Sequence, residues 1–251
     1  MMITSTLNKE TQSSLVKKIE LCLARSKPVT NYAQTNIQLF NQLCLAKYSK
    51  AELSYIHTAY QFGLQIFTNR FCSSGKLFLS HLVGVASILA SVHAPIKVIA
   101  AALLHAAYID GKYETDEKGI TNAKREQVRS VVGIEAEELI ANYTALKWDE
   151  ITIPVICDRL DMLDYKERQL LLIRLAKELE EHLDLGSLYS ANGESHQEYI
   201  RSVLYQCVEM AHRLGFPTLA AALECNFRDT CAAQIPAIRT NRDSSFLLSP
   251  A

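Results

Sequence analysis

Two histidines in apolar surroundings are the residues of this chain best suited to chemistry. His81 lies in the run LFLSHLVGVASILA and His105 in the run IAAALLHAAYID. An imidazole in a hydrophobic helix needs a hydrogen-bond partner or a metal ion, because burying an unpaired polar group costs on the order of 1–3 kcal/mol. Imidazole also titrates near neutral pH, so a pair of them can exchange protons with a substrate. We therefore treat residues 76–110 as the centre of the molecule.

Two consecutive helices are expected to position these imidazoles. The first covers residues 78–92 and places His81, Gly84 and Ile88 on one face, where the glycine allows another backbone to approach closely. The second covers residues 96–107, in which only a lysine and His105 are polar. A helix that is apolar almost all round is typical of the centre of a bundle. The polar segment 111–119 then follows as a loop beside the site.

The remaining chain reads as supporting helices. Ser49 is a plausible N-cap for the helix that follows it. Residues 148–154 carry no assignable pattern. Apolar periodicity predicts helices over 11–25, 31–47, 50–69, 123–132, 134–146, 166–183, 196–214 and 217–230. The inward faces expected for 31–47 and 50–69 consist of Ile37, Phe40, Leu43 and Cys44, and of Leu53, Ile56, Tyr60 and Leu64. Leu172, Leu175, Leu179 and His182 form the stripe expected for 166–183.

Composition favours a single all-α domain. The chain has 251 residues, 49% of them hydrophobic, with only nine glycines and six prolines. It is long enough for one large core and lacks the regular turn signals of a β protein. We expect one helical bundle of about nine or ten helices. Within it, residues 1–70 form N-terminal helices packed on a core of residues 70–235, and residues 236–251 form a tail.

Charge and hydropathy exclude several classes of partner. The formal net charge is −1, with 26 basic and 27 acidic residues interspersed. No field of one sign is available for a nucleic acid or an anionic membrane. No uncharged run reaches the ~20 residues that span a bilayer, and no secretory signal opens the chain. We expect a cytoplasmic protein with a small-molecule ligand, and leave a homodimer open.

The seven cysteines do not predict a metal or disulfide framework. They are odd in number and scattered, and no C-x-x-C pair occurs. Most are expected on apolar helix faces, where a thiol behaves as a small hydrophobic group. They therefore favour reduced core cysteines, as is usual in the cytosol.

A family resemblance connects the two histidines with a later helix. No motif of nucleotide-binding loops, zinc proteases or serine hydrolases is present. The runs around His81 and His105, followed by LLLIRLAKELEEHL, resemble the metal-dependent HD superfamily, in particular its helical ppGpp-hydrolase branch. The family pattern is H, then HD, then a pair of acids, then D. The likeness covers residues 70–185 and implies an HD-like helical core.

Two of the acids that the family uses as metal ligands are absent. The residue after His105 is Ala106 instead of aspartate, and Lys177 occupies the position of the last aspartate. Asp110 matches the second of the paired acids, while Ile109 replaces the first. Two neutral imidazoles without anionic oxygen are a poor site for Mn²⁺, Mg²⁺ or Fe²⁺, and a lysine would repel the ion further. We therefore predict a degenerate site with no metal and no cofactor.

The same chain resembles an uncharacterised HD-like family found near bacterial natural-product genes. The phrases H-L-V-G and L-L-H-x-x-Y carry that likeness and include Tyr108. If the family arrangement is kept, five side chains are expected to meet as a catalytic group, with five more as substrate-binding neighbours. The catalytic set is His81, His105, Lys177, Tyr108 and Asp110. The binding set is Arg70, Glu178, Glu181, His182 and Arg125.

Each candidate also has a purely structural interpretation. Either histidine alone could be a hydrogen-bonded core residue, and Lys177 could be a solvated residue that pairs with Glu181 four positions later. Tyr108 could simply end a buried helix, and Arg125 could lie on an exposed face. These alternatives stay open on the sequence alone.

Three functions are compatible with these residues. The first is a metal-independent enzyme of secondary metabolism, which would act by acid/base chemistry on a small polar or anionic metabolite in a lyase, isomerase or cyclase step. The second is a non-catalytic module that senses a ligand or binds a partner. The third is a metallohydrolase or oxygenase with unusual ligands, for instance His81, His105, Asp110 and His182.

Overall fold

The computed structural model describes residues 32–113, 119–184 and 193–232, and the side chains of 193–202 and 226–232 are not described. The described part is helical, and its only extended pairing is an isolated bridge between Phe71 and Leu77. Its elements are α2 (Asn36–Leu45), α3 (Lys50–Phe67), α4 (Phe78–Ser91), α5 (Ile96–Leu103), α6 (Ala107–Asp110), α7 (Asn122–Ala145), α8 (Thr152–Asp158), η1 (Leu160–Met162), α9 (Tyr165–Leu183), α10 (Gly193–Arg213) and α11 (Pro217–Ala232). The all-α prediction is confirmed.

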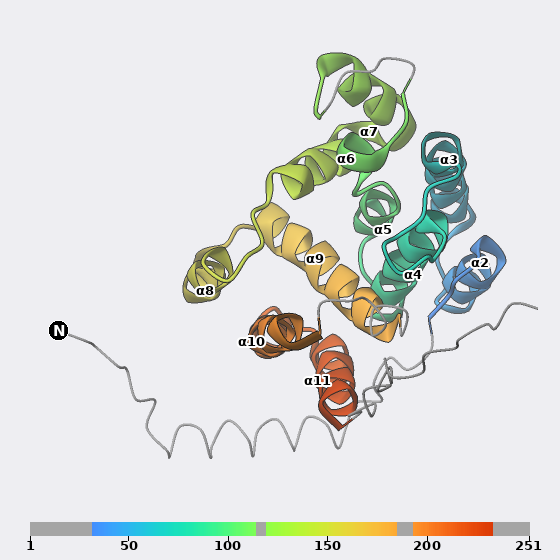
Figure 1. The fold of residues 1–251 in the computed structure, drawn as a ribbon. Coiled ribbons are helices and arrows are strands. Elements are labelled where there is room, and N and C mark those ends of the chain that lie inside the picture. The colour runs from blue at the N-terminus through green and yellow to red at the C-terminus, as the bar shows by residue number, and fades with distance from the viewer. Residues whose placement is uncertain (1–31, 114–118, 185–192, 233–251) are drawn as a thin grey trace, which may run out of the picture.

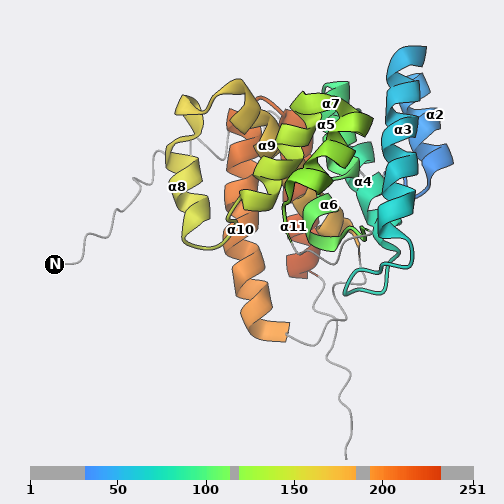
Figure 2. The same ribbon diagram turned by 90° about the horizontal axis from the view of Figure 1, so that it is seen from above.

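Three helices form the centre of the bundle. In Figure 1, α9 crosses the middle of the molecule, with α4 and α5 on one side of it and α10 and α11 on the other. Helix α7 packs along α5, and α2 and α3 cover the outer side of α4 and α5. Figure 2 shows α8 at the opposite edge from α2 and α3, beside α10. The predicted histidine helices are therefore central.

Helix α4 is buried on all of its faces over most of its length. All ten residues from His81 to Ala90 are buried, because α2, α5 and α9 surround this stretch. Helix α9 is similar in its middle, where Ile173 and Ala176 are buried beside the expected leucine stripe. Apolar neighbours on every side mean that any polar group here must find its partner inside the protein.

The second histidine helix is shorter than predicted. It ends at Leu103, and a turn separates it from α6. The imidazole of His105 explains the break, because its Nδ1 lies 2.7 Å from the carbonyl oxygen of Ala102. That oxygen would otherwise accept the amide N–H of Ala106 in a continuing helix. The side chain therefore takes over a helical hydrogen bond and ends the helix at the site.

Helix α7 consists of two segments, as the sequence predicted. The break predicted between Val132 and Ile134 is seen at Gly133, whose φ of 74° and ψ of 172° are not helical. A positive φ is accessible to glycine at little cost, which explains the residue used. The tyrosine hydroxyl of Tyr55 in α3 donates to the carbonyl of Val132 at 2.5 Å, so the bend is tied to the bundle.

The predicted inward faces of the two N-terminal described helices were partly wrong. In α2 the buried residues are Leu39 and Leu43, whereas Ile37 is 70% exposed and Cys44 is exposed. In α3 the buried face is Ile56, Ala59, Gly63, Ile66 and Phe67, and the other predicted residues lie at its margin. Small residues let α3 approach α5 closely, and a periodicity based on large side chains does not register them.

Local signals account for several helix ends. Ser49 caps α3 as predicted, and its partner Glu52 completes a capping box. Asp149 accounts for the segment without a pattern, because its carboxylate accepts the amide N–H of Thr152 at 2.8 Å and so starts α8. The predicted helix 11–25, the loop residues 114–118 and 186–192 and the tail 236–251 lie outside the described residues.

Candidate functional site

The structure brings His81 and His105 together at the centre of the bundle. Their ring centroids are 5.6 Å apart and the rings meet edge to face at 72°. His81 comes from α4 and His105 from the turn after α5, and they are 4% and 2% exposed. The two imidazoles thus form one buried pair, as the shared site requires.

Glu180 of α9 is the acid that accompanies this pair. One carboxylate oxygen contacts Nδ1 of His81, and the other is paired with the ammonium of Lys76. Glu180 is 1% exposed, so the carboxylate depends on these two partners for its stabilisation. Lys76 also lies 3.4 Å from the hydroxyl of Tyr32. We call His81, His105, Glu180 and Lys76 the histidine cluster.

Gly84 makes room for the carboxylate. A Cβ atom at this position would lie 2.8 Å from Cγ of Glu180 and 2.9 Å from the ring of Tyr32. Both distances are shorter than side chains tolerate, so any larger residue would displace the glutamate. The sequence predicted that another backbone approaches Gly84; the close neighbours are instead the side chains of Glu180 and Tyr32.

The surroundings of His105 keep its imidazole neutral. Burial lowers the pKa of His105 well below its ordinary value, and a positive charge on His81, Lys177 or Arg174 lowers it further. The ring of Tyr143 packs against it with centroids 4.9 Å apart. A neutral imidazole with a low pKa is a proton acceptor that stays unprotonated at pH 7.

Both imidazoles are fixed in the same tautomer. Nδ1 of His81 faces a carboxylate and Nδ1 of His105 faces a carbonyl oxygen, and neither group can donate a hydrogen bond. Each Nδ1 must therefore carry the proton, which leaves Nε2 of each neutral ring with its lone pair. This is the arrangement in which a histidine serves as a general base.

A second ionic group lies next to Tyr143, the residue whose ring packs against His105. Arg174 pairs with Glu178 on the same helix, and its guanidinium lies 3.3 Å from the hydroxyl of Tyr143. The same guanidinium stacks over the ring of Trp148 at 5.0 Å. Buried charges here occur as opposite pairs, so the region as a whole carries no large excess of either sign.

Lys177, Glu181 and His182 lie on α9, and the charges of Lys177 and Glu181 interact with the two histidines. The Lys177 ammonium lies 2.5 Å from the carboxylate of Glu181, the pairing given by the structural interpretation. Its charge nevertheless contributes to the low pKa of His105. Nδ1 of His182 lies 2.5 Å from the backbone carbonyl of Glu178 on its own helix. Lys177 is thus close enough to act electrostatically, and His182 is held by α9.

Tyr108 and Arg125 belong to a different group. The Tyr108 hydroxyl donates to Glu137 at 2.7 Å, and Nε and Nη2 of Arg125 donate to the same carboxylate at 2.6 and 2.9 Å. Arg129 adds a fourth bond at 2.9 Å. We call Glu137, Tyr108, Arg125 and Arg129 the Glu137 clamp. Burial alone would raise the pKa of Glu137, but these donors outweigh it and hold that pKa below its ordinary value.

Arg70 and Asp110 complete the predicted set. Nε of Arg70 is buried without a hydrogen-bond partner in the described structure, and its carbonyl accepts the N–H of Phe78 at 3.0 Å. The Asp110 carboxylate ends α6, half-buried, and within the described residues it makes no hydrogen bond or ion pair. Within the described residues, no hydrogen bond or ion pair joins either side chain to the histidines.

Glu180, Lys76 and Glu137 were missed by sequence reasoning. A signal for Glu180 existed, because it follows the buried residues Ile173 and Ala176 by seven and four positions and so lies on the inward face of α9. The family pattern drew attention to Lys177 instead. Lys76 and Glu137 had no comparable signal, since a charged residue in an amphipathic segment is usually solvated.

The donor set does not fit a metal ion. Among the described residues, no group of three or more His, Cys, Asp or Glu side chains is arranged to hold one. Nε2 of His81 and of His105 keeps its lone pair, but the Glu180 carboxylate beside them is engaged by Lys76 and His81 and is neutralised by the lysine. Of the further ligands considered for a metalloenzyme, His182 is hydrogen-bonded to the carbonyl of Glu178, and Asp110 has no hydrogen bond or ion pair within the described residues. We therefore derive no step through a metal.

Comparisons with known proteins give a fold likeness and no activity. Residues 65–147 match the family model "Domain of unknown function (DUF6817)", which is about a third of the chain. No curated protein matches. A solved structure described as "A metazoan ortholog of SpoT hydrolyzes ppGpp and plays a role in starvation responses" is 18% identical, with a TM-score of 0.49, over 73% of this chain and 98% of that one. The likeness is too distant to carry an activity over.

None of the described helices is both long and apolar enough to cross a bilayer. The described cysteines Cys44, Cys72, Cys157, Cys207 and Cys225 are free thiols. Cys157 and Cys207 are buried as expected, whereas Cys44 is exposed, so the prediction of core cysteines holds for only part of the set.

Proposed function

We propose that this chain is a metal-independent HD-like enzyme that acts by proton transfer on a small polar or anionic metabolite, in a lyase, isomerase or cyclase step. One observation carries the proposal: two adjacent imidazoles have their Nδ1 atoms fixed by acceptors, which leaves two basic Nε2 atoms in one buried site. A place in secondary metabolism depends only on the sequence resemblance.

His81 is the general base in this proposal. Its Nε2 takes a proton from the substrate, and the imidazolium that forms is stabilised by Glu180 on the other side of the ring. Lys76 holds the second oxygen of that carboxylate and so fixes its position. The proton returns from His81 to a different atom of the substrate, or to its leaving group, which completes an isomerisation or an elimination.

His105 and the nearby cations have supporting roles. With its lowered pKa, His105 remains neutral and can accept a hydrogen bond from the substrate through Nε2. Lys177 and Arg70 are the cations available for an anionic group, and Nε of Arg70 has no partner in the described structure. Tyr108 and Asp110 are not needed for this scheme.

A turnover screen tests the proposal. Purified protein is incubated with pools of small polar and anionic metabolites, with and without a chelator, and products are followed by mass spectrometry. Turnover should survive chelation and fall by roughly 10²- to 10⁴-fold in His81→Gln. The variant His93→Asn is the matched control, because His93 is exposed with a φ of 54° that asparagine tolerates. Equal turnover by His81→Gln, or turnover that requires a metal, would refute the proposal.

A non-catalytic binding module is the second candidate. The nearly complete burial of both imidazoles favours it, because a hydrogen-bonded core pair needs no substrate. The same pools separate the two candidates. A compound that raises the melting temperature of the protein, and is recovered unchanged, would identify a ligand-binding module.

A further inference from the structure

The outer face of α2 and α3 is unusual in its composition. Neither residues 36–45 nor residues 53–67 contain a lysine, arginine, aspartate or glutamate. At the average of 21% charged residues for this chain, about five would be expected in a stretch of this length. The outward positions of these helices nevertheless face solvent. A surface without charge is typical of the centre of a protein interface.

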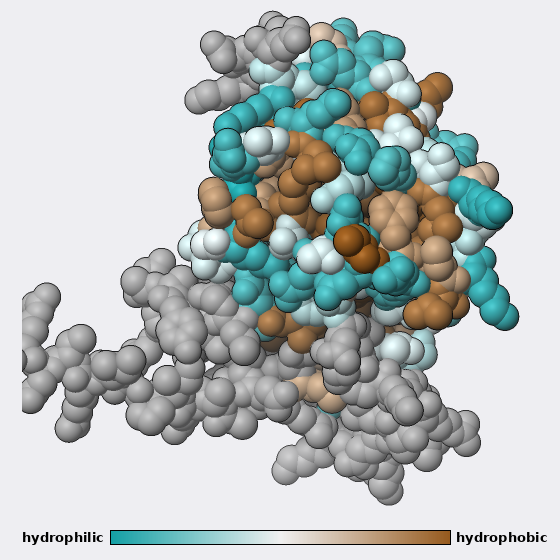
Figure 3. All heavy atoms as spheres, turned by 90° about the vertical axis from the view of Figure 1, so that its right-hand side faces the viewer, coloured by the Kyte–Doolittle hydropathy of each residue, from teal (hydrophilic) through white to brown (hydrophobic). Residues whose placement is uncertain are grey.

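Exposed apolar side chains lie on this face. Ile37 is 70% exposed and Leu45 is 84% exposed, and with Asn41 they form a stripe at i, i+4 and i+8 of α2. Figure 3 shows hydrophobic surface in several patches on the side of the molecule that carries these helices. Exposed aliphatic groups in a row cost hydration free energy unless something covers them.

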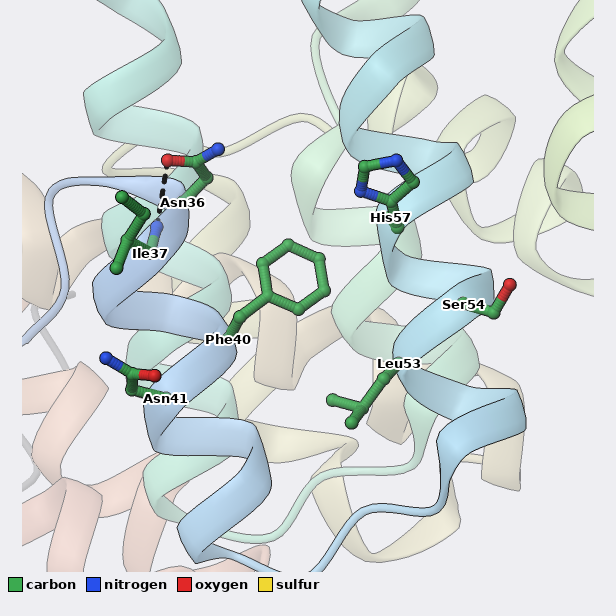
Figure 4. A pocket seen from close by; sticks show the side chains of 7 residues that line it. All are labelled: Asn36, Ile37, Phe40, Asn41, Leu53, Ser54 and His57. Atoms are coloured by element: carbon green, nitrogen blue, oxygen red, sulfur yellow. Dashed lines mark hydrogen bonds between the residues drawn. The ribbon is translucent and has the colours of Figure 1, made fainter.

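A shallow groove of about 390 Å³ separates the two helices. In Figure 4 the ring of Phe40 lies between them, with Ile37 and Asn41 on one wall and Leu53 and His57 on the other. The rings of Phe40 and His57 are 6.0 Å apart. The groove contains none of the residues of the histidine cluster, so it is a separate feature.

The inner side of α2 is firmly attached to the bundle. The amide nitrogen of Gln42 donates to the carbonyl of Ser87 in α4 at 2.9 Å, and the Ser87 hydroxyl donates back to Gln42 at 2.5 Å. A capping box at Thr35 fixes the start of the helix. The outward stripe therefore belongs to an anchored helix and is presented at a fixed position.

We propose that this face binds a second copy of the chain, with α2 packed against α2 of the partner about a two-fold axis. Residues near such an axis meet copies of themselves, so a charge of either sign would repel its counterpart. The absence of both signs fits that geometry, whereas a different partner protein could be matched by opposite charges. The groove beside Phe40 then receives the aliphatic side chains of the facing stripe.

The size of the face predicts the strength of the dimer. Helices of 10 and 18 residues are ~15 and ~27 Å long and ~10 Å wide, which gives roughly 400 Å² of flat footprint for each copy. Two copies together bury roughly 800 Å², which is below the ~1,200 Å² of standard specific interfaces and in the range of weak, transient ones. We expect a dimer with a Kd of micromolar order.

Sedimentation equilibrium on the full chain tests the interface. Between about 1 and 100 µM the wild-type protein should pass from monomer to dimer, and Ile37→Glu should remain monomeric with an unchanged helical circular dichroism spectrum. Ile134→Glu is the matched control, because Ile134 is 64% exposed on α7, and it should dimerise as the wild type does. A wild-type monomer over this range, or dimerisation by Ile37→Glu, would overturn the proposal.

A charge-swap experiment tests the two-fold arrangement itself. Asn41 is the exposed middle residue of the stripe, and the proposed packing places it closest to the axis. Asn41→Asp and Asn41→Lys should each be monomeric alone, and an equimolar mixture should form a heterodimer. A mixture that stays monomeric would overturn the symmetric packing. If the wild type is monomeric and Ile37→Glu lowers its melting temperature, the face is covered by the chain itself, which also overturns the proposal.

Discussion

The histidine cluster and the Glu137 clamp are both built around a buried glutamate, but they differ in what the carboxylate can do. Glu137 accepts four hydrogen bonds, from Tyr108, Arg125 and Arg129, and so uses all of its ordinary acceptor capacity. Two of its partners are guanidinium groups that do not titrate. Glu180 instead shares its charge between a lysine and an imidazole. Only the second arrangement contains an imidazole, the side chain best suited to general acid/base chemistry.

The position of each glutamate matches that difference. Glu137 lies after the bend at Gly133 and both arginines lie before it, so the clamp joins the two segments of α7 and adds α6 through Tyr108. The histidine cluster joins α4, the end of α5 and α9, which are the central helices. We infer that the clamp holds the bend in α7, and that the cluster is where proton transfer can occur.

The largest expected effect comes from neutralising the clamp. Glu137→Gln leaves two guanidinium groups facing an amide in a site where the glutamate is 0% exposed, and we expect a loss of about 2–4 kcal/mol of stability. Urea denaturation measures it. Glu138→Gln is the matched control, because the neighbouring Glu138 pairs with Lys166 on the surface and its loss should change little. A loss below about 1 kcal/mol in Glu137→Gln would mean that the clamp is not structural.

A smaller loss is expected from filling the space beside Glu180. In Gly84→Ala the new Cβ would displace the carboxylate, and overpacking of this kind costs about 1–3 kcal/mol. Gly63→Ala is the control, because its Cβ would have no neighbour closer than 3.5 Å and helical alanine is favoured over glycine. Thermal denaturation of both variants checks the comparison. Equal melting temperatures would show that Glu180 is not tightly held.

Sequence reasoning predicted the helices and the histidine pair well, for identifiable reasons. Apolar runs with helical periodicity define α4, α9 and the two segments of α7, and glycine marks the bend. The family resemblance placed His81 beside His105 across 23 intervening residues. The break after α5 was not predictable, since it depends on a hydrogen bond from the imidazole of His105 to the backbone.

The partners of the site were harder to predict than the site itself. Tyr108 follows His105 by three residues, yet its hydroxyl is directed to α7, because Glu137 supplies an acceptor there. Glu178 and Glu180 lie two residues apart on α9 and pair with different cations, Arg174 and Lys76. The direction of a long polar side chain is determined by neighbours from distant segments, and the local sequence does not contain that information.

Protonation of His105 should make stability depend on pH just below pH 6.5, whereas the lowered pKa of Glu137 places the contribution of the clamp below about pH 4.5. Because its pKa is lowered on folding, the unfolded chain binds this proton more readily. Stability is then constant above the unfolded pKa of ~6.5 and falls as the pH drops below it, by up to ~1.4 kcal/mol for each pH unit. His105→Gln should flatten the decline between about pH 6.5 and 5, and His93→Asn should not. Denaturation experiments across this pH range measure the change of stability with pH. The same slope in the wild type, His105→Gln and His93→Asn would contradict a buried neutral imidazole at His105.

The smallest effect is expected at Lys177, where it separates an electrostatic role from a structural one. Lys177→Gln removes a helical ion pair with Glu181, which is worth about 0.2–0.5 kcal/mol. It also removes one of the positive charges that lower the pKa of His105, so that pKa should rise. The protein should consequently lose less stability on acidification than the wild type. An NMR titration of the His105 ring protons measures the change directly, with Lys166→Gln as a surface control that leaves the titration unaltered. An unchanged titration in Lys177→Gln would place its charge outside the site and leave Arg70 as the remaining cation proposed for substrate binding.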